Sequence, residues 1–227
     1  MTTSAITSGR DQVLILGIGN LLWADEGFGV RCIEALSARH AFDARVRLLD
    51  GGTQGIYLVN QLEGVGHLII FDAIDYDLPP GTLNVMRDGD VPRFLGAKKM
   101  SLHQVGFQNV LAMAELLGQL PPKLLLIGVQ PERLEDYGGS LSPSVKAMIE
   151  PALSEALIYL HAQGIRPVTT ATQTEAGHLA HATRNTTRMR DGAHPHPALA
   201  LSDYENGRPS PTQAWRQGDP RFLPVGP

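Results

Sequence analysis

Residues 13–18 read VLILGI and are followed at 19–30 by GNLLWADEGFGV. An apolar run of this length that ends in glycines is typical of a strand buried on both faces of a sheet. The next stretch, Glu26–Arg39, spaces its apolar side chains as one face of a helix does, at Val30, Ile33 and Leu36. A buried strand followed by an amphipathic helix is the repeating unit of an α/β sheet.

The same alternation continues to about residue 165. Further apolar runs predict strands at Val46–Leu49, His67–Phe71, Thr82–Met86 and Leu124–Val129. Helices are predicted at Ile56–Leu62, Ser101–Leu117 and Pro143–Gln163, the last of them kinked or split by Pro151. Strands that alternate with helices predict a mostly parallel sheet that is covered on both faces.

One connection is too short for a parallel pair of strands. Nine residues separate Asp72 from Thr82, fewer than a parallel crossover needs, so these two strands run antiparallel if they are neighbours. The predicted fold class is therefore α/β. We expect a three-layer α/β/α sandwich around a five-stranded, mostly parallel twisted sheet that contains one antiparallel strand.

Composition divides the chain into one domain and its flanks. Of its 227 residues, 43% are hydrophobic and 19% charged, as in globular proteins. Near residue 166 the apolar periodicity stops, and half of the 16 prolines lie beyond that point. We expect a flexible N-terminus at residues 1–10, one folded domain at 11–165, and a Pro/His-rich, disordered tail at 166–227.

Charge, cysteine content and hydropathy narrow the class of protein. A net charge of −4 gives no electrostatic reason to expect nucleic acid or an anionic membrane as partner. The single cysteine, Cys32, cannot form an internal disulfide and suits a reducing compartment. The first ten residues lack the apolar core of a signal peptide, and residues 13–23 are too short to span a bilayer. We expect a cytoplasmic protein.

Acidic residues and one histidine follow the predicted strands. They are, in chain order, Asp25, Glu26, Asp50, Asp72 and His103. In open α/β sheets, functional sites form at the carboxyl ends of the strands. We therefore expect these side chains to meet at one edge of the sheet.

His103 has a local reason to be a metal ligand. Ser101 and Gln104 fit a capping box, which makes Ser101 the N-cap and places His103 in the first helical turn. The positive end of the helix dipole disfavours the imidazolium there, and the neutral imidazole is the form that binds metals. The alternative is an ordinary solvated side chain in a first turn.

Two carboxylates complete a candidate ligand set. Asp72 ends an apolar strand and needs a cation or donors to stay charged, although it could cap a neighbouring loop instead. Glu26 opens a helix, where an acid also favours the dipole. With His103 they would suit Zn, Ni, Mn or Fe and leave positions open for a substrate. The HExxH and GxSxG patterns of other hydrolases are absent from the sequence.

The glycines after the first strand allow a second interpretation. Gly17 and Gly19 could begin a dinucleotide fingerprint, but the third glycine position is occupied by Leu22 and the next acid, Asp50, lies too far along the chain. Glycines that let the backbone turn tightly are the other explanation. A Rossmann-like nucleotide-binding module remains an alternative function.

Several motifs together resemble the [NiFe]-hydrogenase maturation proteases. They occur in order over about residues 13–160 and leave the tail uncovered. The motifs are GIGNLLWADEGFGV (17–30), LLDGGTQG (48–55), LIIFDAIDY (68–76) with PGT (80–82), SLHQVGF (101–107), LLLIGVQPE (124–132) and SPSVKAMIEPAL (142–153).

The resemblance implies an endopeptidase that removes a C-terminal extension from the large-subunit precursor of a hydrogenase after nickel insertion. The cut follows a basic or histidine residue beyond the last cysteine motif of the precursor. The resemblance also implies that Glu26, Asp72 and His103 contact nickel held by the precursor, with no organic cofactor. The loop Asp50, Gly51, Gly52 and Thr53 corresponds to a family loop linked to substrate specificity.

The resemblance leaves the cleavage chemistry open. The family is classed as aspartic-type, and the catalytic candidates are Asp72, Glu26 and His103. A metal could activate a water or polarise the scissile carbonyl, or one of the carboxylates could act as general base. A non-catalytic assembly chaperone that holds the hydrogenase subunit is a further alternative.

Overall fold

The main sheet has five strands in the order β3-β1-β4-β6-β5. The computed structural model describes residues 11–91, 102–134 and 136–169. In sheet order, the strands are Val46–Gly52, Gln12–Ile18, Val65–Ala73, Lys123–Val129 and Leu83–Arg87. The first four are parallel to their neighbours, whereas β5 is antiparallel to β6. The predicted five-stranded sheet with one antiparallel strand is confirmed.

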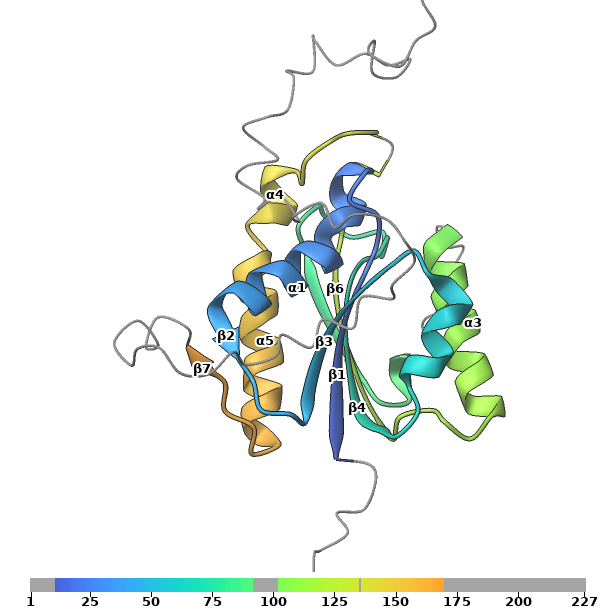
Figure 1. Cartoon of the computed structure of the whole chain (residues 1–227). Coiled ribbons are helices and arrows are strands. Elements are labelled where there is room, and N and C mark those ends of the chain that lie inside the picture. The colour runs from blue at the N-terminus through green and yellow to red at the C-terminus, as the bar shows by residue number, and fades with distance from the viewer. Residues whose placement is uncertain (1–10, 92–101, 135, 170–227) are drawn as a thin grey trace, which may run out of the picture. The chain divides into compact units, whose positions relative to one another are not determined.

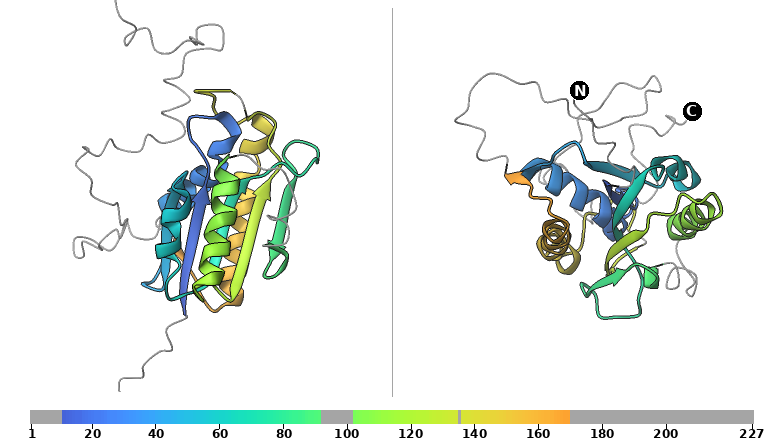
Figure 2. Two further views of the ribbon diagram at one scale, coloured as in Figure 1. Left: turned by 90° about the vertical axis from the view of Figure 1, so that its right-hand side faces the viewer. Right: turned by 90° about the horizontal axis from the view of Figure 1, so that it is seen from below.

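Helices cover both faces of this sheet. On one face lie α1 (Phe28–Arg39) and α5 (Ile149–Ala162), and on the other lie α3 (Leu102–Leu116) and the 3₁₀ helix η2 (Gly55–Gln61), as Figures 1 and 2 show. The side chains of β1 alternate between the two faces, and Leu14 and Leu16 join the apolar cluster formed with η2 and α3. The three-layer sandwich is thus the one predicted.

The connection after β4 does not join neighbouring strands. β6 occupies the place beside β4, so the link passes over the end of β6 before β5 begins on its far side. Backbone hydrogen bonds from Ile74 to the carbonyl of Val129, and between Gln130 and both Gly81 and Thr82, hold the link there. The antiparallel pair is therefore β5 with β6.

One predicted helix begins later than expected, and another is split as expected. α1 begins at Phe28 and is preceded by a separate 3₁₀ turn, η1 (Ala24–Gly27), which contains Glu26. The last predicted helix is split into α4 (Pro143–Lys146) and α5, with Pro151 in the first turn of α5. A proline in a first turn loses no helical hydrogen bond, which explains why the break precedes it.

A small second sheet lies at the end of the described chain. Its strands β2 (His40–Ala41) and β7 (Val168–Thr169) pair antiparallel, so regular structure continues just beyond the predicted domain end at residue 165. Residues 1–10 and 170–227 lie outside the described residues, and the predicted flexible N-terminus and disordered tail stay predictions. Among the described helices, none has both the length and the apolar character that a membrane span requires.

Candidate functional site

The carboxyl ends of β1 and β4 form a topological switch point, where the connections lead to opposite sides of the sheet. From β1 the chain leads to β3 on one side, and β4 then pairs with β1 on the other side. In open α/β sheets, ligands bind at such a switch point. η1 follows β1 there, and Asp72 lies at the end of β4.

Glycines bring the segment of Glu26 against the end of β4. A Cβ atom on Gly29 would lie 2.2 Å from the carbonyl oxygen of Phe71, and one on Gly17 would lie 2.3 Å from the carbonyl oxygen of Gly29. The first turn of α1 therefore packs directly on the backbone next to Asp72. η1 itself also contacts β4, so Glu26 and Asp72 belong to adjoining segments at one edge of the sheet.

The backbone of Glu26 is fixed by the turn after β1. Gly19 has a φ of 131°, and a Cβ atom there would lie 1.8 Å from the carbonyl oxygen of Glu26. The N–H of Asn20 donates to that same oxygen at 3.1 Å. The prediction that these glycines shape the backbone is confirmed at Gly19. Because Gly17 and Gly19 pack against protein backbone, they do not leave the open approach that a pyrophosphate needs.

Asp72 is almost completely buried, with 2% of its surface exposed. Leu68 and Ile70 of β4 belong to the cluster with α3, and alternation along the strand places Asp72 on that same face. Its register partner on β6 is Gly128. This burial agrees with the expectation that a carboxylate at the end of an apolar strand is desolvated.

Tyr76 lies beside Asp72 and has no sequence signal that marks it. A Cβ atom on Gly128 would lie 1.9 Å from the Tyr76 hydroxyl oxygen, so the ring lies over the register partner of Asp72. Burial, and then the charge of Asp72, raise the pKa of Tyr76 well above its ordinary value. The hydroxyl therefore stays protonated next to the carboxylate.

His103 is the second residue of α3. Its side chain, and Ser101 with the predicted cap, lie outside the described residues. α3 leads by a short link into β6 and runs opposite to it, so α3 begins at the edge where the parallel strands end (Figure 1). The three predicted segments thus share one edge. Among the side chains that the structure describes, which do not include His103, no group of three His, Cys, Asp or Glu forms a metal site.

The loop Asp50–Thr53 adjoins this edge from the side of β3. Asp50 is the register partner of Gly17, and the N–H of Gly19 donates to the carbonyl oxygen of Gly52 at 3.1 Å. Gly52 has a φ of 45° and donates its N–H to Oδ1 of Asp50 at 2.9 Å. Burial raises the pKa of Asp50, and this hydrogen bond opposes the rise. Thr53 is exposed.

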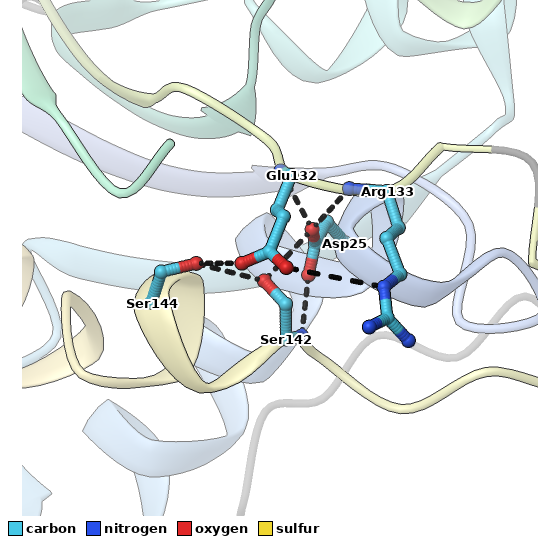
Figure 3. A network of polar contacts seen from close by, with 5 residues as sticks. All are labelled: Asp25, Glu132, Arg133, Ser142 and Ser144. Carbon is cyan, nitrogen blue, oxygen red and sulfur yellow. Dashed lines mark hydrogen bonds and ion pairs between the residues drawn. The ribbon is translucent and has the colours of Figure 1, made fainter. Parts of the chain in front are cut away.

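Asp25 and Gln130 are polar residues whose roles the sequence did not reveal. Asp25 is 0% exposed and accepts hydrogen bonds from segments that follow β6 (Figure 3). Gln130 is 7% exposed and binds the backbone of the link that follows Asp72. Position after a strand end is the signal that both share, and it does not separate a structural role from a catalytic one.

Comparison with known families identifies the chain. A family model described as hydrogenase maturation protease matches residues 30–158. The matched range includes Asp72 and His103, whereas η1 with Glu26 lies just before it. The chain belongs to the hydrogenase maturation protease family. Its members are peptidases, so this maturation protease is a peptidase.

Relatives of this maturation protease extend the match. It is 56% identical over 216 residues to the hydrogenase expression/formation protein HoxM of Azotobacter vinelandii, covering 95% of this chain and 96% of the relative. It is 44% identical over 158 residues to the hydrogenase 2 maturation protease of Escherichia coli K12, covering 69% and 95%. The longer match covers 95% of the chain and so exceeds the domain assigned to residues 11–165. Similarity therefore reaches the tail, which the resemblance in sequence motifs had left uncovered.

The fold is also that of solved maturation proteases. The structure resembles the hydrogenase maturating endopeptidase HybD from E. coli with a TM-score of 0.67 and 42% sequence identity, covering 71% of this chain and 99% of the other. The HybD protease from Thermococcus kodakarensis follows with a TM-score of 0.54 and 28% identity, covering 64% and 96%. These likenesses confirm the predicted fold class and the predicted peptidase.

Proposed function

We propose that this maturation protease removes a C-terminal extension from the large-subunit precursor of a [NiFe]-hydrogenase after nickel insertion. It reads the nickel in the precursor through Glu26, Asp72 and His103. The observation that most directly supports this function is the packing of Gly29 on the Phe71 carbonyl. That contact brings the segment of Glu26 to the strand end that bears Asp72.

The donor set suits a transient contact with a metal that belongs to the substrate. Two carboxylates and one imidazole are harder ligands than cysteine thiolates. Nickel held by the cysteines of the precursor would keep those bonds and add weaker ones to the protease. A precursor without nickel would lack these contacts, so the protease would bind it less tightly.

Cleavage needs a group that takes the proton from the attacking water. A general base must reach that water, and the half-buried Glu26 is more accessible than Asp72, which is 2% exposed. We therefore assign the base to Glu26 and a purely cation-binding role to Asp72. Thr53 and Asp50 line the neighbouring edge, where they would contact the peptide on either side of the cut.

The reaction is assigned to the cytoplasm. Cys32 is a free thiol and fully buried. Burial, and then the charge of Glu150, raise its pKa well above the ordinary value. A buried, protonated thiol of this kind is inert. Because the sequence has no second cysteine with which Cys32 could form a disulfide, the chain suits a reducing compartment.

The mass of the precursor tests the proposed function. The wild-type protein should shorten a nickel-loaded precursor and leave a nickel-free one intact. His103→Ala should stay folded and leave both masses unchanged, whereas Asp43→Asn, at an exposed acid that binds Arg45, should act as wild type does. Complete cleavage by His103→Ala would remove His103 from the site.

The same measurement separates the alternatives. A loaded precursor that stays bound to wild-type protein at full mass would indicate a chaperone that holds the subunit without cutting it. A fluorescence titration with a dinucleotide tests the nucleotide-binding alternative. We expect no saturable change in fluorescence. Gly17 and Gly19 pack against the backbone of Gly29 and Glu26, so they leave no room for a pyrophosphate.

A further inference from the structure

Asp25 directly precedes Glu26 and is fully buried. Its Oδ2 accepts hydrogen bonds from the backbone N–H groups of Glu132 and Arg133, both at 2.8 Å. Its Oδ1 accepts one from the backbone N–H of Ser142 at 2.6 Å, and the Ser142 hydroxyl donates to Oδ2 at 3.0 Å. Figure 3 shows the carboxylate enclosed by these donors.

These contacts join three segments that are far apart in the sequence. Asp25 lies in η1 after β1, Glu132 and Arg133 follow β6, and Ser142 precedes α4. The backbone repeats the connection, because the N–H of Asp25 donates to the carbonyl oxygen of Arg133 at 3.2 Å. A buried carboxylate that accepts four hydrogen bonds has its acceptor capacity filled, so Asp25 is committed to this clamp.

The clamp has a second layer that supports its donors. Ser142 and Ser144 are in hydroxyl contact at 3.1 Å, and the Ser144 hydroxyl donates to Oε2 of Glu132 at 2.6 Å. Glu132 in turn lies 4.0 Å from Nε of Arg133 as an ion pair. The segment before α4 and the segment after β6 are thus tied to each other as well as to Asp25 (Figure 3).

The turn that carries Asp25 and Glu26 is strained. Ala24 has a φ of 36°, in the left-handed region that residues other than glycine rarely adopt. Such a conformation persists when the surrounding structure overdetermines it. Ala24 is itself 2% exposed. The residue after it, Asp25, is held in place by its own hydrogen bonds, so the turn is fixed by its surroundings.

We infer that Asp25 is a positioning residue that fixes the direction of the Glu26 carboxylate toward the nickel of the precursor. Successive side chains of a 3₁₀ turn point about 120° apart. Anchoring Asp25 inward therefore determines where Glu26 points. This inference rests on the proposed function, in which Glu26 contacts nickel.

Nickel discrimination is the measurement that tests this role. We define it as the Kd of the nickel-free precursor divided by the Kd of the nickel-loaded precursor. Asp25→Asn keeps the shape of the side chain but places an amide against backbone donors. We expect it to lower the ratio about tenfold and to leave the Kd of the nickel-free precursor unchanged. Asp43→Asn, an exposed acid, is the matched control and should keep the wild-type ratio.

A double variant shows whether Asp25 acts through Glu26. Glu26→Gln alone should lower the ratio, and adding Asp25→Asn to it should lower the ratio no further, because the two residues would then act as one unit. Further loss in the double variant, or an equal loss of affinity for both precursors in Asp25→Asn, would overturn the positioning role. Either result would mean that Asp25 supports the fold in general.

If Asp25→Asn does not fold, Ser142→Ala takes its place in the measurement of nickel discrimination. It removes one of the four hydrogen bonds, so the ratio should fall about threefold, while Ser154→Ala at an exposed hydroxyl should leave it unchanged. An unchanged ratio in Ser142→Ala, with Asp25→Asn unfolded, would overturn the inference. A wild-type ratio near one overturns the nickel readout itself and the inference with it. A normal wild-type ratio that persists in Asp25→Asn overturns the inference alone.

Discussion

The side-chain oxygen of Gln130 accepts a hydrogen bond of 2.6 Å from the backbone N–H of Tyr76. The same oxygen accepts a second one from the N–H of Leu78 at 3.2 Å, and the Gln130 amide donates to Oδ1 of Asp75 at 3.0 Å. One buried amide at the end of β6 thus organises the link that leaves β4 directly after Asp72. The geometry of the candidate site depends on this residue, although it is not a candidate ligand.

Gln130→Ala should lower the free energy of unfolding by about 2 kcal/mol, because it removes the acceptor of the buried Tyr76 N–H and of the partly buried Leu78 N–H. Chemical denaturation followed by tryptophan fluorescence measures the change. Gln163→Ala, at the exposed end of α5, is the matched control and should stay within about 0.5 kcal/mol of wild type. If the two variants unfold at the same denaturant concentration, Gln130 does not hold the link.

Gly128 leaves room for the ring of Tyr76, and this contact can be tested by a pair of variants. Gly128→Ala would place a Cβ atom 1.9 Å from the Tyr76 hydroxyl oxygen and 2.8 Å from Cζ. We expect it to cost about 1–3 kcal/mol of stability. Gly89→Ala, where a Cβ atom would meet nothing within 4 Å, should be close to neutral.

Removing the hydroxyl should recover part of that loss. In the Tyr76→Phe background the shortest clash of Gly128→Ala is gone and the contact with the ring carbon remains. The double variant should therefore be less destabilised than the sum of the single variants, by a coupling energy of about 1 kcal/mol. Strict additivity would show that Tyr76 does not lie over Gly128.

The sequence predicted the sheet well because each strand carries its own signal. The apolar run His67–Phe71 lies inside β4, and its burial on both faces is what a central parallel strand requires. The neighbour of β5 could not be predicted in the same way. It depends on β6, which is more than thirty residues farther along the chain than β5, and no local pattern reports that pairing.

The location of Asp72 could be predicted for a similar reason, whereas its role and those of the other site residues stay predictions. Asp72 could be singled out because it ends an apolar strand, and the structure places it at the switch point. Asp25 and Glu26 are adjacent acids with the same local signal. Asp25 differs in its donors, which Arg133 and Ser142 supply from over a hundred residues away. No local pattern therefore marks Asp25 as the acid that is buried in the clamp.

His67 should make stability depend on pH. Its Nδ1 lies 2.8 Å from the Tyr159 hydroxyl oxygen. Burial raises the pKa of Tyr159 to about 12, so this hydroxyl stays protonated. Burial, followed by the charge of Lys123, lowers the pKa of His67 from its ordinary 6.5, and the charges of Asp11 and Asp88 act in the opposite direction.

The sign of the pH effect follows from the lowered pKa of His67. The unfolded chain takes up the proton at a higher pH than the folded chain does, so stability falls as pH decreases from 6.5 through the lowered folded value. Wild-type protein should therefore lose stability between about pH 7 and about pH 5, and His67→Gln should lose less. His161→Gln, at an exposed position of α5, should follow wild type. Parallel curves for wild type and His67→Gln would exclude His67 as the source.

Two shortened chains test where the folded domain ends. The predicted domain ends at Ile165, which is 3% exposed and donates its N–H to the carbonyl oxygen of Leu160 at 2.9 Å. β7 follows it and pairs with β2. A chain that ends after Thr169 keeps both features, whereas one that ends after Gly164 loses both. The shorter chain should be less stable by at least about 2 kcal/mol, since burial of an isoleucine side chain alone contributes about that much.

The same pair of chains decides whether residues 170–227 are needed for the fold. Denaturation midpoints and the mass of a processed precursor should match wild type for the chain that ends after Thr169. Ile165→Ala in the full-length protein is the matched variant, and should reproduce most of the difference between the two shortened chains because it empties the same buried position. If the chain ending after Thr169 fails to fold, the segment beyond it belongs to the domain. If both shortened chains match wild type, neither Ile165 nor the β2–β7 pair contributes to stability.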